Sequence, residues 1–169
     1  MLRKITVLLI IFIGYILQCS VFTHISLGGI VPNILIIITS SFGFMRGKNE
    51  GLAIGFIAGL MVDVFFGGIL GFYALSYMVI GYVNGFFKSI FYPEDIKLPM
   101  VLICTSELLY CMICYVFLFL MRGRLNLGYY FIHVILPEMV YTVLITIIFY
   151  RLILIVNEWL EGIEKRSSR

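Results

Sequence analysis

The sequence predicts an all-α polytopic membrane protein, a bundle of six transmembrane helices that forms one membrane domain. Composition is the first reason: 62% of the 169 residues are hydrophobic and 12% are charged, against roughly 45–50% and 25% in soluble domains. The second is a mean hydropathy of +1.11. The third is that the apolar residues gather in spans of membrane-helix length, with basic residues concentrated between them.

A window of about 19 residues divides the chain into six apolar spans. They cover residues 5–23, 30–45, 51–66, 70–87, 99–121 and 131–150, followed by a short tail over 151–169. The third span is short, because about 16 residues rise about 24 Å against a hydrocarbon core of about 30 Å. A re-entrant hairpin over 51–87 is therefore an alternative to two full spans. A tight turn at Gly67 and Gly68 favours the two spans.

The basic residues predict the orientation of the bundle. In the six-span arrangement only Arg122 and Arg124 lie on the outer side. The other side carries Arg3, Lys4, Arg46, Lys48, Lys88, Lys97, Arg151, Lys165, Arg166 and Arg169. Because cytoplasmic loops are enriched in Lys and Arg, both termini are predicted to be cytoplasmic. The first span is longer than a signal peptide's apolar region and lacks a cleavage site, so we interpret it as a retained helix.

Small residues recur every four positions in the middle of the chain. The series runs Gly43, Gly47, Gly51, Gly55, Gly59, Asp63, Gly67 and Gly71. Small residues at this spacing let two helices approach closely in lipid. Gly51, Gly55, Gly59 and Asp63 are therefore predicted to form a helix-packing or partner-binding face, against a helix of this chain or of another protein.

Three acidic residues lie inside apolar spans: Asp63, Glu107 and Glu138. A carboxylate at the centre of a bilayer costs about 2.5–3.5 kcal/mol on insertion scales. The three acids are therefore a candidate intramembrane polar site that lines a cavity or meets polar groups of a partner. The alternative is a protonated acid hydrogen-bonded to a neighbouring hydroxyl or carbonyl group.

The loop after the second span contains Arg46, Lys48 and Glu50. Glu50 lies where the third helix begins, and a negative charge there interacts favourably with the helix dipole. It can also pair with Arg46 or Lys48. The sequence therefore predicts a cytoplasmic loop of defined shape that could serve as a docking surface.

The remaining residues predict no catalytic site, no cofactor and no metal site. Cys19, Cys104, Cys111 and Cys114 all lie within apolar spans without a histidine pair nearby, so we interpret them as core residues. No phosphate-binding loop, dinucleotide fingerprint or nucleophile elbow is present in the sequence. The scattered basic residues indicate contact with lipid headgroups and not with nucleic acid.

Several of these residues together resemble one known family. They are Pro32-Asn33, Arg46-Gly47, Glu50-Gly51, Gly55-Phe56, Gly59-Leu60, Asp63, Gly67, Leu70-Gly71, Ala74-Leu75 and Pro137-Glu138. The pattern is similar to MreD, a family of small bacterial membrane proteins that determine rod shape. The resemblance extends over essentially the whole chain, and the block from 46 to 71 is its most specific part.

The resemblance implies a non-enzymatic subunit of the cell-wall elongation machinery in the bacterial plasma membrane. The implied partner is MreC, with direct or indirect links to MreB, RodA and a class B penicillin-binding protein. A chain without a soluble domain or cofactor motif is suited to binding other helices.

Two other classes remain open from the sequence. The first is the substrate-capturing component of an energy-coupling-factor vitamin transporter, a six-helix protein whose fold MreD is thought to resemble. Such components commonly carry alanine-rich contacts on the first helix, whereas residues 5–17 here are mostly large and aliphatic. The second is a small intramembrane enzyme that uses Asp63, Glu107 or Glu138 as a general acid or base.

Overall fold

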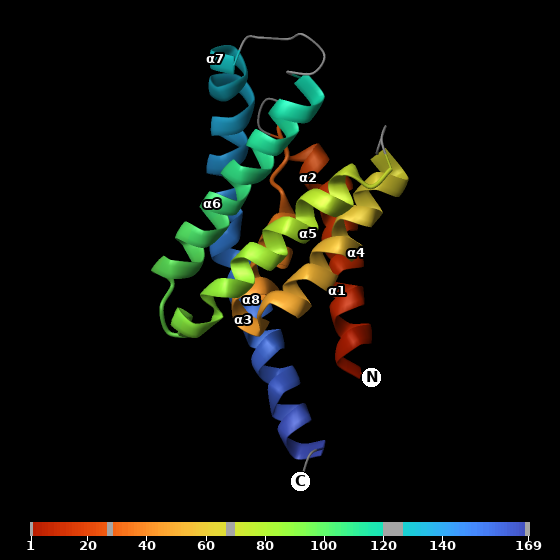
Figure 1. The fold of residues 1–169 in the computed structure, drawn as a ribbon, viewed down its shortest axis with the longest axis vertical. Helices are drawn as coiled ribbons and strands as arrows, with labels where there is room; N and C mark the ends of the chain where they lie inside the picture. Colours follow the sequence, from red (N-terminus) through yellow and green to blue (C-terminus); the bar gives the residue numbers. More distant parts are fainter. Residues whose placement is uncertain (1, 27–28, 67–69, 120–126, 168–169) are drawn as a thin grey trace.

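The computed structural model describes residues 2–26, 29–66, 70–119 and 127–167, and these residues are almost entirely helical (Figure 1). The α-helices are α1 (Leu2–Cys19), α2 (Val21–His24), α3 (Ile34–Arg46), α4 (Lys48–Phe66), α5 (Phe72–Asn84), α6 (Lys97–Cys114), α7 (Leu127–Tyr130) and α8 (Leu136–Ser167). A 3₁₀-helix, η1 (Gly85–Ile90), extends α5. Two π-helices follow α6 and α7, η2 (Tyr115–Phe119) and η4 (Phe131–Ile135).

The predicted fold class is confirmed: the chain is an all-α membrane protein with six helical segments. Within the described residues, three segments are long and apolar enough to cross a membrane by length and composition, Arg3–His24, Lys97–Phe117 and Gly128–Arg166. The helices α3 and α5 have 13 residues each. The 19-residue α4 contains Lys48, Glu50 and Asp63.

The largest departure from the predicted boundaries is at the C-terminal end. The sequence predicts a span that ends at residue 150 and a separate tail, whereas α8 is one helix of 32 residues that continues to Ser167. Its polar end contains good helix formers, and Asn157 donates a hydrogen bond to Glu161 one turn further on. Hydropathy detects the end of the apolar segment and not the end of the helix.

The centre of the bundle is α3, in which every residue from Ile34 to Met45 is buried. It contacts α1, α4, α5, α6 and α8. Most of its side chains are apolar, and the polar Thr39, Ser40 and Ser41 are buried with them. Its N-cap is Asn33, whose side chain accepts a hydrogen bond from the Ile36 amide, and it ends at Gly47, which has a positive φ of 107°.

The outer surface is apolar over the long helices. Exposed large side chains include Ile5 and Leu8 on α1, Val101 on α6, and Leu144 and Ile148 on α8. Apolar surface of this extent is unusual for a soluble monomer and is the surface that lipid covers. Gly67 and Gly68, the predicted turn between the third and fourth spans, lie outside the described residues, as do Arg122 and Arg124.

Candidate functional site

The glycine face of α4 lies directly against the backbone of α5 (Figure 1). A Cβ atom at Gly51, Gly55 or Gly59 would overlap a backbone carbonyl oxygen of α5. The contact is reciprocal, because a Cβ at Gly81 of α5 would overlap the Gly51 carbonyl oxygen. The sequence left open whether this face meets a helix of this chain or of another protein. In the structure it meets a helix of the same chain.

At the far end of this contact, Asp63 caps α5. Its Oδ1 accepts a hydrogen bond from the Tyr73 amide at 3.0 Å, and its Oδ2 accepts one from the Ala74 amide at 2.8 Å. The residue at the N-cap position of α5 itself, Gly71, has no side chain that could accept these hydrogen bonds. A buried carboxylate that accepts two amide hydrogen bonds at a helix N-terminus is well compensated. The cost of placing Asp63 inside an apolar span is therefore offset by the first turn of α5.

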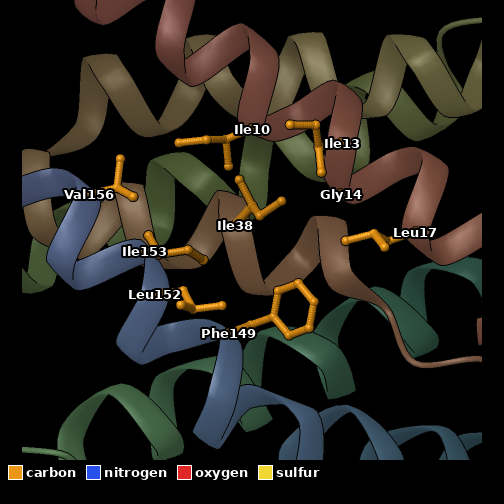
Figure 2. Close-up of a pocket in the computed structure, with 9 residues that line it drawn as sticks. All are labelled: Ile10, Ile13, Gly14, Leu17, Ile38, Phe149, Leu152, Ile153 and Val156. Atoms are coloured by element: carbon orange, nitrogen blue, oxygen red, sulfur yellow. The ribbon is translucent and has the colours of Figure 1, made fainter. Parts of the chain in front are cut away.

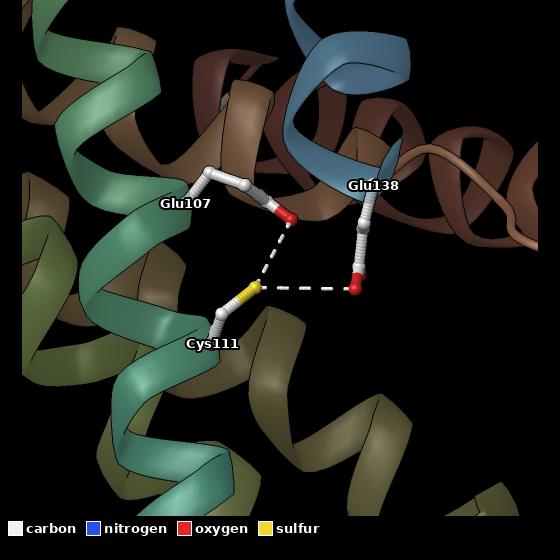
Figure 3. Close-up of side chains that lie close together, drawn as sticks. All are labelled: Glu107, Cys111 and Glu138. Atoms are coloured by element: carbon white, nitrogen blue, oxygen red, sulfur yellow. Dashed lines mark hydrogen bonds between the residues drawn. The ribbon is translucent and has the colours of Figure 1, made fainter. Parts of the chain in front are cut away.

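The other two intramembrane acids lie close together, one on α6 and the other on α8. This place is separate from the helix cap that Asp63 forms. Cys111 lies between them, with its Sγ 4.0 Å from Glu107 Oε1 and 3.9 Å from Glu138 Oε2 (Figure 3). Glu107 is fully buried, and its Oε2 has no hydrogen-bond partner among the described residues. The three predicted acids thus form two separate arrangements, a helix cap and a pair.

In the part of the chain that the structure describes, Glu107, Cys111 and Glu138 form a group that could hold a metal ion. One ligand atom from each lies within 4.8 Å of the others. Thiolate and carboxylate groups are ligands that Zn²⁺ accepts. Cys111 has the sequence context of a core residue, but its spacing of four from Glu107 places both on one face of α6.

A cluster of ion pairs joins the two ends of the chain to the predicted loop. Arg3 Nη2 lies 2.9 Å from Glu50 Oε2, and Arg3 Nη1 lies 2.9 Å from Glu164 Oε2. Arg46 contacts the same two glutamates at 3.4 Å and Glu161 at 3.0 Å. We call these five residues the charged cluster; it connects α1, α3, α4 and α8.

The charged cluster contains two of the three predicted loop residues. Arg46 and Glu50 pair with each other, whereas Lys48 places its ammonium 3.8 Å from the centre of the Phe86 ring. Sequence reasoning did not find Arg3, Glu161 and Glu164 as partners, because they are more than 40 residues from the loop. Only Arg3 lies next to the end of a predicted apolar span, whereas Glu161 and Glu164 lie in the tail beyond residue 150.

We expect Arg46→Ala to lower the stability of the protein by about 1–2 kcal/mol, because Glu161 would lose its ion pair with Arg46, and Glu50 and Glu164 would keep only their contacts with Arg3. Arg151→Ala is the matched control, since Arg151 is exposed on α8. The stability of both variants is measured by thermal unfolding in detergent, at low and at high salt. The difference in stability between the two variants should become smaller at high salt, because salt screens exposed charges. Equal unfolding temperatures for the two variants would contradict this role of Arg46.

Buried polar contacts that the sequence analysis did not predict join α3 to its neighbours. The Asn33 amide donates to Thr142 Oγ1 on α8 at 3.0 Å, and Asn33 Oδ1 accepts from the Tyr77 hydroxyl on α5 at 2.8 Å. Asn84 on α5 donates to Ser106 Oγ on α6 at 2.7 Å. Polar groups inside a membrane bundle need such partners.

A cavity of about 230 Å³ lies between α1, α3 and α8 (Figure 2). Its lining is apolar, with Ile13 and Leu17 from α1, Ile38 from α3 and Phe149 from α8 among the side chains that surround it. A cavity without a convergent polar group offers no chemistry beyond apolar contact.

These features define a class of protein: a helical membrane protein held together by close backbone packing, buried hydrogen bonds and a charged cluster at one end. The model of a family described as rod shape-determining protein MreD matches residues 1–157. The chain belongs to the MreD family, and the resemblance found in the sequence is confirmed. No curated protein and no solved structure matches the chain.

Membership of this family supports a role in determining rod shape. MreD is a family of structural, shape-determining proteins and is not a known enzyme family.

Proposed function

We propose that this chain is a non-enzymatic subunit of the machinery that inserts peptidoglycan along the side wall of a rod-shaped bacterium. In this proposal it binds MreC and is linked, directly or through MreC, to MreB, RodA and a class B penicillin-binding protein. The observation that carries the proposal is the MreD family match over residues 1–157. The polar groups agree with it, because Asp63 is used as a helix cap and not at an open cleft.

We further propose that all six helical segments lie in the plasma membrane with both termini in the cytoplasm. Arg3 and Glu164 pair at 2.9 Å, so the first helix begins where α8 approaches its end. Figure 1 shows both termini toward the same end of the bundle. The positive-inside rule supports a cytoplasmic position for this end, which carries Arg3, Lys4, Arg46 and Lys165.

The contact with MreC is expected on the outward-facing side chains. The glycine face of α4 is covered by α5, and α3 is surrounded by other helices of the chain. A transmembrane helix of a partner would therefore meet exposed residues such as Phe12, Phe56 or Leu144.

The test is site-specific photo-cross-linking in the protein's own host. A photoreactive residue replaces Phe12, Phe56 or Leu144, and a matched control carries it at Ile37, which is fully buried on α3. We expect a cross-link to MreC from at least one outward site and none from Ile37. A tagged chain purified in mild detergent should also recover MreC, RodA and the penicillin-binding protein.

Depletion of the chain should convert rods to round cells, and re-expression should restore them. Normal rods after depletion, together with no recovery of MreC, would contradict the proposal. Recovery of ATPases with a transmembrane coupling subunit would instead indicate a component of an energy-coupling-factor transporter.

A further inference from the structure

A second, larger cavity opens between α1 and α4, with a volume of about 610 Å³. Its walls are apolar and come from Val7, Leu8 and Ile11 on α1 and Ala53, Ile54 and Ile57 on α4. One end is different, because Arg3, Lys4, Glu50 and Glu164 line it. We call this cavity the α1–α4 groove and its polar end the charged mouth. An apolar groove with a few polar groups at one end is the usual form of a binding site for an amphipathic molecule.

The charged mouth contains both signs of charge. Arg3 and Arg46 are the two cations of the charged cluster, and they share three carboxylates, those of Glu50, Glu161 and Glu164. The mouth itself, lined by Arg3, Lys4, Glu50 and Glu164, carries two charges of each sign. Lys4 is exposed beside the charged cluster and has no ion pair among the residues that the structure describes.

The carboxylates of the charged mouth can accept further hydrogen bonds. The Glu50 and Glu164 side chains are 42% and 46% exposed although both contact Arg3. A carboxylate has about four acceptor positions, and an ammonium group that keeps its N–H bonds can use those that remain. Lys4 in turn offers three donors to a phosphate. The mouth is thus complementary to a zwitterion that carries a phosphate and a primary ammonium.

We propose that the α1–α4 groove binds one phosphatidylethanolamine molecule of the surrounding membrane. An acyl chain lies between α1 and α4, the phosphate lies at Lys4, and the ammonium donates hydrogen bonds to Glu50 and Glu164. The position suits a lipid, since the membrane-length helix Arg3–His24 begins at the charged mouth, where headgroups are found.

The chemistry of the headgroup separates this lipid from others. The quaternary ammonium of phosphatidylcholine has no N–H to donate to Glu50 or Glu164. The headgroup of phosphatidylglycerol has no cation and offers only neutral hydroxyl groups to Glu50 and Glu164. Both are expected to bind more weakly than phosphatidylethanolamine.

The size of the groove favours a lipid chain over a helix of another protein. A helix is about 10 Å across, so a segment that crosses a hydrocarbon core of about 30 Å occupies roughly 2,400 Å³. The groove, with about 610 Å³, is smaller than this volume. A partner helix could cover the groove from outside but could not lie within it.

The test is the binding of lipid to the purified full-length chain. The protein is placed in nanodiscs with equal amounts of phosphatidylethanolamine, phosphatidylcholine and phosphatidylglycerol, and retained lipids are identified by native mass spectrometry. We expect phosphatidylethanolamine to be retained about tenfold over each competitor, the ratio that corresponds to one hydrogen bond to a charged group. Equal retention of the three lipids, or no retained lipid, would overturn the proposal.

Two variants locate the binding. Ala53→Trp fills the groove, and Val101→Trp is its control because Val101 faces outward on α6. We expect the first to lose the retained lipid and the second to keep it. Lys4→Gln changes only an exposed side chain at the mouth, so it tests the site even if Ala53→Trp does not fold; it should lower retention about tenfold. Unchanged retention in Lys4→Gln, or a protein chain cross-linked from position 53 in place of lipid, would exclude this occupant.

Discussion

Replacing Gly55 with alanine is expected to destabilise the protein by about 3 kcal/mol, the upper end of the cost of overpacking. The new methyl group would overlap the Tyr77 carbonyl oxygen and lie 2.7 Å from the Tyr77 carbonyl carbon. These atoms belong to the backbone of α5 and cannot turn away as a side chain could. Helices α4 and α5 would have to separate, which would weaken their contact along much of its length.

The control for this variant is Gly162→Ala. Gly162 also lies within a helix, but a Cβ there would have no atom within 4 Å. Alanine is the better helix former by about 1 kcal/mol, so Gly162→Ala should leave stability unchanged or raise it slightly. The two variants are compared by unfolding them with increasing amounts of a denaturing detergent, and unfolding is followed by circular dichroism. A Gly55→Ala protein as stable as Gly162→Ala would show that α4 and α5 are not packed this closely.

The same pair of variants connects packing to cell shape. A chain whose α4 and α5 separate should be present at lower levels in the membrane, and it should fail to restore rods in depleted cells. The Gly162→Ala chain should restore them. Normal rods with Gly55→Ala at normal levels would mean that the close α4–α5 contact is not needed for shape determination.

Part of this contact was accessible from the sequence. The four-residue spacing of Gly51, Gly55 and Gly59 predicts a face on which another helix lies closely, since the spacing of small residues is local information. The identity of that helix was not accessible. It depends on Gly81 and the backbone of α5, and the sequence does not state which surface meets the glycines.

The acidic residues show the same limit. Asp63, Glu107 and Glu138 could be identified as candidate site residues because they lie deep in apolar spans. The cost of placing a carboxylate there can be judged from the span alone. Their partners depend on tertiary structure. Asp63 binds amides ten and eleven residues away, and Glu107 meets Glu138 on another helix through Cys111.

The charged cluster was the least accessible feature. Arg3 and Glu164 are 161 residues apart, and their contact requires that α8 continue as a helix beyond its apolar segment. A boundary set by hydropathy at residue 150 separated Glu161 and Glu164 from the last predicted span and placed them in the tail. Charge pairs between the two ends of a chain follow from the fold and cannot be found before it.

Removing the carboxylate of Asp63 is the second change for which we expect a large effect. Asp63→Leu would keep a similar volume but leave the amides of Tyr73 and Ala74 without their acceptors, at about 1–3 kcal/mol for each buried donor. Asp63→Asn keeps one oxygen as an acceptor and loses the charge, so it should cost about half as much. The order of stability should therefore be wild type, then Asp63→Asn, then Asp63→Leu.

Asp95 provides a matched control for the same chemistry in water. Its Oδ1 accepts a hydrogen bond from the Lys97 amide at 2.9 Å at the start of α6, but it is exposed. Water can replace this acceptor, so Asp95→Asn should change stability by about 0.5 kcal/mol or less. Hydrogen exchange measured by mass spectrometry should show faster exchange in the first turn of α5 for the Asp63 variants. Unchanged protection there, or an equal loss of stability for Asp95→Asn and Asp63→Asn, would mean that burial does not strengthen the cap, and the intramembrane position of Asp63 would then need another explanation.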